Sequence, residues 1–139
     1  MTAVTPLAPR PFADSTDSLL RFAMRLDATL SGLVGLFVAA AADPFSALTG
    51  LSSLSIYGLG AFLVLGGLAV YALAAAPDLR RVGVALIVGN IGLTIAALVV
   101  VAVRALPLTE TGVAAALATA GYFALMGYLQ YLGVRRLPA

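Results

Sequence analysis

Four polar side chains interrupt the long apolar segments of this chain, and they are its main candidates for chemistry. Arg25 and Asp27 lie near the start of the first apolar segment, Asn90 lies within the third, and Gln130 lies near the end of the fourth. A charge inside a bilayer is costly and needs a partner, so an intramembrane acid points to an ion or proton site or to a structural ion pair. We therefore predict an intramembrane polar cluster of Arg25, Asp27, Asn90 and Gln130.

This cluster has two interpretations. In the functional interpretation, Asp27 is the ligand or proton site. In the structural interpretation, Asp27 pairs with a nearby arginine, while Asn90 and Gln130 form hydrogen bonds across helices, worth about 0.6 kcal/mol each on average. The structural interpretation is favoured by the sequence, because the polar groups are few and arginines can reach down from the membrane interface.

The composition indicates an integral membrane protein and removes several chemistries. Of the 139 residues, 62% are hydrophobic and only 10% are charged, whereas a soluble domain carries about 25% charged residues. The mean hydropathy is +1.07. The sequence has no Cys, His or Lys, so thiolate, imidazole and Schiff-base chemistry are excluded. The net charge of +2 is too small and scattered for a nucleic-acid surface. We expect no catalytic residue, no cofactor, no metal site and no nucleic-acid partner.

The apolar segments predict an all-α fold, a bundle of four transmembrane helices. Asp43-Pro44 ends the first helix and Pro77 stops the second, because the residue before a proline is disfavoured in helical conformation. Residues 45–53 are predicted to form a short non-spanning turn of helix followed by a loop. The helices are expected at about 18–42, 54–76, 82–103 and 112–134, within a transmembrane domain at 18–136 that is flanked by a disordered cytoplasmic tail at 1–17 and a short cytoplasmic tail at 137–139.

Arginines predict the orientation. Seven of the eight fall on one side of a four-span arrangement and only Arg104 falls on the other, so the positive-inside rule places both termini in the cytoplasm. We expect the membrane to be a bacterial inner (plasma) membrane. Four arginines at helix ends are topology determinants and candidate lipid-headgroup contacts: Arg80, Arg81, Arg135 and Arg136. An alternative stays open for the first segment, because arginines, an apolar core and small residues before Asp43 also fit a cleaved signal peptide.

Small residues follow one face of several predicted helices, which suits close helix contact. Asp27 itself shares its face with Ser31 and Gly35, and similar stripes follow the third and fourth helices. The lipid bilayer is one expected partner. Other membrane protein subunits, or a second copy of the chain, are expected partners for these faces.

Three stretches resemble a family of small, uncharacterised four-helix integral membrane proteins of actinobacterial-like bacteria. They are R-L-D-A-T-L-S-G-L-V-G-L at 25–36, the asparagine at position 90, and L-Q-Y-L-G-V-R-R at 129–136. The resemblance covers nearly all of the chain from Arg21 onward. It implies the four-helix fold and implies no activity. By size and by its acid in the first helix, the chain is also similar to small multidrug exporters, although it is longer and has no Trp.

Two functions are therefore expected from the sequence. The lack of reactive side chains and the small-residue faces favour an accessory, assembly or structural subunit of a larger membrane complex. The alternative is a small oligomeric transporter or channel that uses Asp27 as an ion- or proton-responsive site. A lipid-acting membrane enzyme ranks third, because no nucleophile–base pair is visible. An arginine paired with Asp27 would favour the structural role, and a cavity that reaches Asp27 would favour the transport role.

Overall fold

The described part of the chain is all-helical, as predicted, and four of the helices in it are long and apolar enough to cross a membrane. The computed structural model describes residues 16–138, so most of the tail predicted at 1–17 lies outside the described residues. The helices in this range are α1 (Ser18–Ala40), α2 (Ala42–Thr49), α3 (Ser53–Leu73), α4 (Leu79–Ala102) and α5 (Glu110–Arg135).

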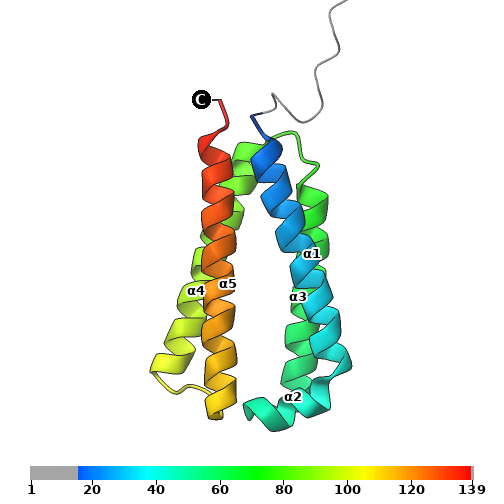
Figure 1. Cartoon of the computed structure of the whole chain (residues 1–139), viewed down its shortest axis with the longest axis vertical. Helices are drawn as coiled ribbons and strands as arrows, with labels where there is room; N and C mark the ends of the chain where they lie inside the picture. The colour runs from blue at the N-terminus through cyan, green and yellow to red at the C-terminus, as the bar shows by residue number, and fades with distance from the viewer. Residues whose placement is uncertain (1–15, 139) are drawn as a thin grey trace, which may run out of the picture.

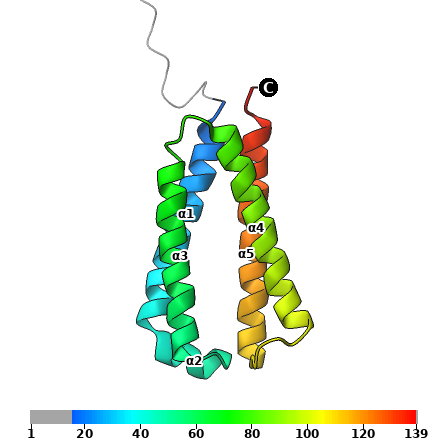
Figure 2. The same cartoon turned by 180° about the vertical axis from the view of Figure 1, so that it is seen from behind.

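The four long helices are arranged as two pairs. Helix α1 packs along α3, and α4 packs along α5, while α1 and α5 provide the main contact between the pairs. The start of α1 and the end of α5 lie together at one end of the molecule, and the short α2 lies at the other (Figures 1 and 2). We call these the terminal end and the α2 end.

The first predicted helix is present and is two residues shorter than the expected 18–42. Helix α1 ends at Ala40, and the backbone at Ala41 leaves the helical region with φ −108° and ψ 31°. Pro44 does not stop a helix as predicted but lies in the first turn of α2. Proline is tolerated there because the first backbone N–H groups of a helix have no partner within it. The non-spanning helix predicted after Phe45 is present, and it starts three residues earlier.

Side-chain caps explain why α4 and α5 begin before their predicted starts at 82 and 112. The Asp78 carboxylate accepts a hydrogen bond of 3.2 Å from the backbone N–H of Arg81, which starts α4 at Leu79. The Thr109 hydroxyl accepts one of 3.0 Å from the N–H of Gly112, which starts α5 at Glu110. Both caps satisfy backbone donors that the first turn of a helix leaves free.

Glycines bring α1 and α3 into close contact. A Cβ atom added to Gly60 would lie 2.7 Å from the carbonyl oxygen of Gly35, and one added to Gly67 would lie 2.7 Å from that of Ala28. Only residues without a side chain allow the two backbones to approach this closely. The small-residue face predicted on the first helix is therefore used, in part, within the chain.

The two pairs are joined at both ends. At the terminal end, a buried apolar cluster connects α1, α4 and α5 through Leu20, Leu79 and Val134. At the α2 end, the backbone N–H of Thr109 donates a hydrogen bond of 3.0 Å to the carbonyl of Thr49, and the Thr109 hydroxyl donates to the carbonyl of Leu48. The two helix pairs are thus connected at both the terminal end and the α2 end.

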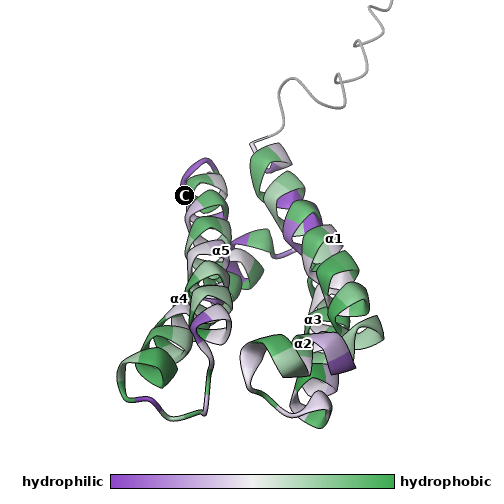
Figure 3. Cartoon of the chain, turned by 60° about the horizontal axis from the view of Figure 1, so that its bottom comes forward, coloured by the Kyte–Doolittle hydropathy of each residue, from purple (hydrophilic) through white to green (hydrophobic). Residues whose placement is uncertain are grey.

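The outer surface is apolar. Hydrophobic residues cover most of the four long helices, and hydrophilic ones gather at helix ends, in loops and on the first half of α1 (Figure 3). Exposed residues on α3 and α4 include Phe62, Leu65, Val88, Ile91 and Ile95. Such a surface is typical of helices that face lipid.

Candidate functional site

Asp27 is buried on the inner face of α1, with 5% of its surface exposed. It lies one turn before Ser31 and one turn after the fully buried Met24. Residues three or four apart share one face of a helix, so the core-facing stripe of α1 carries the carboxylate inward. The apolar cluster at the terminal end fixes the rotation of α1 and hence the direction of Asp27.

Both carboxylate oxygens of Asp27 accept hydrogen bonds. The Gln130 amide donates to Oδ2 at 2.9 Å. The Tyr122 hydroxyl donates to Oδ1 at 2.7 Å. The single proton of the Ser31 hydroxyl can be donated either to the same Oδ1, at 3.2 Å, or to the Tyr122 oxygen. Tyr122 and Ser31 also share a hydrogen bond of 3.1 Å. A carboxylate on α1 is therefore held mainly by two side chains of α5.

Asn90 extends this arrangement to α4. Its amide donates a hydrogen bond of 2.9 Å to Oε1 of Gln130, whose side chain is fully buried. Three of the predicted residues, Asp27, Asn90 and Gln130, thus form one hydrogen-bonded chain across three helices. With Tyr122 and Ser31 they make up what we call the Asp27 network.

Arg25 does not join the Asp27 network, contrary to the prediction. It is exposed, while Asp27 is buried. Positions two apart on a helix point in different directions, so a residue beside the acid in sequence is not beside it in space. The position of Arg25 along the helix axis predicts that it lies near the other three residues. Its side chain nevertheless points away from them, because it is on a different face of α1.

The arginine partner that the structural interpretation required for Asp27 is also missing from residues 16–138. The ion pairs in this range are Arg21–Asp17, at 2.9 Å, and Arg81–Asp78, at 3.8 Å. Every hydrogen-bond donor to Asp27 in this range is uncharged. The other half of that interpretation, a hydrogen bond between Asn90 and Gln130 across helices, is present.

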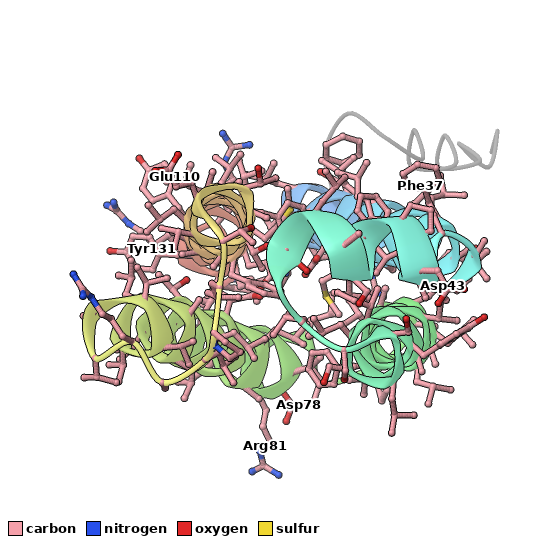
Figure 4. All side chains as sticks on the ribbon, turned by 90° about the horizontal axis from the view of Figure 1, so that it is seen from below. Phe37, Asp43, Asp78, Arg81, Glu110 and Tyr131 are labelled. Carbon is pink, nitrogen blue, oxygen red and sulfur yellow. The ribbon has the colours of Figure 1, made fainter. Side chains whose placement is uncertain are left out.

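The four arginines predicted as lipid contacts lie at the terminal end. Arg80 donates to the carbonyls of Leu137 and Pro138, and Arg135 lies 5.7 Å from the ring centre of Tyr131. Asp78 and Arg81 point away from the helices (Figure 4). Arg136 is exposed beyond the end of α5. These positions suit the membrane–water interface and keep the guanidinium groups away from Asp27.

Two cavities meet at the Asp27 network. The α3/α4 cavity, of about 140 Å³, lies between those helices and is lined by Asp27 and Asn90 among mostly apolar residues. The α1/α5 cavity, of about 240 Å³, is lined by Tyr122 and Thr119 on α5 and by Val34 on α1. Three residues line both cavities and form the partition between them: Ser31, Leu63 and Phe123.

Sequence reasoning missed Tyr122 and the hydrogen-bonding role of Ser31. Tyr128 and Tyr131, near the end of the same helix, are exposed, whereas the Tyr122 hydroxyl reaches Asp27. Tyr122 lies eight residues before Gln130, which is close to two helical turns and so the same face of α5. That spacing is the signal that identifies it.

The acids at the α2 end do not form a second site. Asp43 accepts a hydrogen bond of 2.6 Å from Ser53, whereas Glu110 starts α5 on the other side of the molecule (Figure 4). The described residues contain no group of three or more potential metal-ligating side chains. Comparison with family models, curated proteins and solved structures finds no match to this chain.

Proposed function

We propose that this multi-pass membrane protein is a small transporter or channel in which Asp27 binds and releases a proton or a small cation. The observation that carries the proposal is the environment of Asp27: a buried carboxylate that is held by neutral donors and borders a cavity. Two features would have favoured a purely structural role for Asp27: an arginine partner and a bundle with no cavity at the acid. Within the described residues, Asp27 has no arginine partner and it lines the α3/α4 cavity.

The choice of a carboxylate supports this function. Removing an ion from water costs several kcal/mol even after the protein relaxes around it. An asparagine at position 27 would accept one hydrogen bond from Gln130 or Tyr122 without that penalty. A side chain that only joins helices has no need of the charge, whereas a proton or cation site requires it.

The proposed setting is a bacterial plasma membrane with both termini in the cytoplasm. This orientation follows from the arginines, because within residues 16–138 all of them except Arg104 lie toward the terminal end. The Asp27 network then lies in the cytoplasmic half of the membrane, because Asp27 is in the first half of α1 and Gln130 is near the end of α5.

A flux measurement on reconstituted protein tests the proposal. The purified chain is placed in liposomes, a membrane potential is imposed, and proton and cation entry are followed with reporter dyes. We expect flux above that of empty liposomes, and we expect Asp27→Asn to abolish it. The matched control is Glu110→Gln, which removes an exposed acid outside the network and should leave flux unchanged. Flux in Asp27→Asn equal to that of the unmodified protein contradicts the proposal.

A second candidate function, an accessory subunit of a membrane complex, is favoured by the outer faces of α3 and α4. Very little of α4 is buried inside the chain, and Val88, Ile91 and Ile95 on its surface are exposed. Such a face fits protein as well as lipid. Crosslinking in native membrane followed by mass spectrometry tests it: a stoichiometric partner attached through α3 or α4 supports the subunit role, and a chain with no partner contradicts it.

A further inference from the structure

The Asp27 network crosses the partition between the two cavities. Asp27 and Asn90 line the α3/α4 cavity, and Tyr122 lines the α1/α5 cavity. Ser31 is the polar member of the partition and lines both. Hydrogen bonds connect the Tyr122 hydroxyl to Oδ1 of Asp27 at 2.7 Å and to the Ser31 hydroxyl at 3.1 Å. Two hydroxyl groups therefore stand between the carboxylate and the α1/α5 cavity.

From this geometry we infer that Tyr122 and Ser31 are a proton relay that connects the α1/α5 cavity to Asp27. The inference rests on the proposed function and specifies its ion as a proton. A hydroxyl group both accepts and donates a hydrogen bond, so it passes a proton on while remaining neutral. The amides of Gln130 and Asn90 hold the other side of Asp27 and position it.

The proton transfer conserves atoms and charge, and its only other participant is water in the cavity. A hydronium ion in the α1/α5 cavity gives a proton to the Tyr122 oxygen, and the proton already on that oxygen moves to Oδ1 of Asp27. The phenol is neutral before and after, the carboxylate becomes a carboxylic acid, and water remains in the cavity. Ser31, at 3.2 Å from the same oxygen, provides a parallel step. A cavity of about 240 Å³ has room for water, and Ser31, Thr119 and Tyr122 provide hydrogen-bond partners for it within a wall that is otherwise apolar.

The charged side chains of the neighbouring helices lie away from Asp27, so the Tyr122 and Ser31 hydroxyl groups are the ones placed to pass a proton to it. On α1, Arg21 pairs with Asp17 and Arg25 is exposed. Helix α3 has no charged residue, and its tyrosines, Tyr57 and Tyr71, are exposed. The arginines of α4 lie at its start, where Arg81 pairs with Asp78. On α5, Glu110 and Arg135 lie at its two ends. Tyr122 is thus the titratable side chain that faces Asp27 within residues 16–138.

The two cavities reach different depths. Along α1 and α5, the α1/α5 cavity extends from Ser31 and Tyr122 to Val34 and Ala118, toward the α2 end. The α3/α4 cavity extends from Phe62 and Leu93 to Val70 and Ala85, so it overlaps the α1/α5 cavity in depth and also reaches closer to the terminal end. A relay between them moves a proton along the membrane normal as well as across the partition.

Tyr122→Phe is the decisive variant, because it removes the hydroxyl and keeps the ring that packs against Phe123 at 5.5 Å. In the liposome assay we expect Tyr122→Phe to lower proton flux by ~10²-fold, in the range of a lost proton-transfer group. Ser31→Ala should lower it less, and the double variant should approach Asp27→Asn. Tyr128→Phe, an exposed tyrosine on the same helix, is the matched control and should leave flux unchanged.

Two readouts separate a relay from a structural role and from failure of the proposed function. In the relay, the carboxylic-acid infrared band of Asp27 still forms in Tyr122→Phe at equilibrium, while flux falls. Proton flux of the unmodified protein should also slow in D₂O, which needs no variant to fold. Full flux in Tyr122→Phe or an unchanged rate in D₂O overturns the relay while Asp27→Asn still upholds the proposed function. Flux in the unmodified protein no greater than in empty liposomes overturns both.

Discussion

Nε2 of Gln130 lies 2.9 Å from Oδ2 of Asp27, although the two residues are 103 positions apart in the chain. This contact joins α1 to α5, the two helices through which the pairs meet. Gln130 also accepts a hydrogen bond from Asn90 and so ties α4 to the same carboxylate. A change at Asp27 therefore reaches both helix pairs, because its strongest contacts cross between them.

The contact between Asn90 and Gln130 should show a measurable coupling. We expect a double-mutant cycle with Asn90→Leu and Gln130→Leu to give a coupling free energy of about 0.6 kcal/mol and at most about 1.7 kcal/mol. Gln130→Leu alone should destabilise more than Asn90→Leu, because Gln130 also donates to Asp27. Unfolding in mixed detergent micelles measures all three free energies, and strictly additive effects would show that the two amides do not interact.

Two glycines of α3 should respond in opposite ways to alanine. Gly60→Ala places a Cβ 2.7 Å from the carbonyl oxygen of Gly35, and we expect a loss of about 1–3 kcal/mol through overpacking. Gly58 has open space around it, so Gly58→Ala should be neutral or stabilise the helix by about 0.5–1 kcal/mol. Thermal unfolding in detergent compares them. Equal effects at the two positions would mean that α1 and α3 are not in close contact.

Thr109 should contribute more than an ordinary helix cap. It caps α5 and also donates to the carbonyl of Leu48 at the end of α2. Ser52→Ala removes the cap of α3 and an exposed hydrogen bond to the Ser55 hydroxyl within the same turn, and it should cost about 1 kcal/mol. Thr109→Ala should cost about 1 kcal/mol more, because a second hydrogen bond is lost. The free energy of unfolding of each variant decides this, and equal losses would show that the hydrogen bond from the Thr109 hydroxyl to Leu48 adds nothing to stability.

The proposed orientation is open to single-cysteine labelling, because the chain has no native cysteine. Ala75→Cys lies in the connection between α3 and α4 at the terminal end, and Ala105→Cys lies in the connection between α4 and α5 at the α2 end. A membrane-impermeant maleimide added to intact cells should label Ala105→Cys only. Ala75→Cys should react only after the membrane is broken. The reverse pattern would invert the topology.

The sequence predicts the elements and most of the polar cluster, because a polar residue in a long apolar segment is conspicuous. Asp27, Asn90 and Gln130 are also at matching depth, which is enough to predict that they can meet. Depth in the membrane does not fix the rotation of a helix about its own axis. For that reason the sequence wrongly groups Arg25 with Asp27 and does not identify Tyr122. The pairing of α1 with α3 depends on close backbone contact at Gly35 and Gly60. Other glycines of the chain lie in similar apolar sequence but have open space around them, so the sequence does not show which glycines make the contact.

Infrared difference spectroscopy of the reconstituted protein tests most directly whether Asp27 takes up a proton. Acidification should produce a carboxylic-acid C=O band that shifts in D₂O and is absent from Asp27→Asn. Glu110→Gln should retain this band, because Glu110 lies outside the Asp27 network. Identical acid-induced spectra for the unmodified protein and Asp27→Asn would contradict proton binding at Asp27.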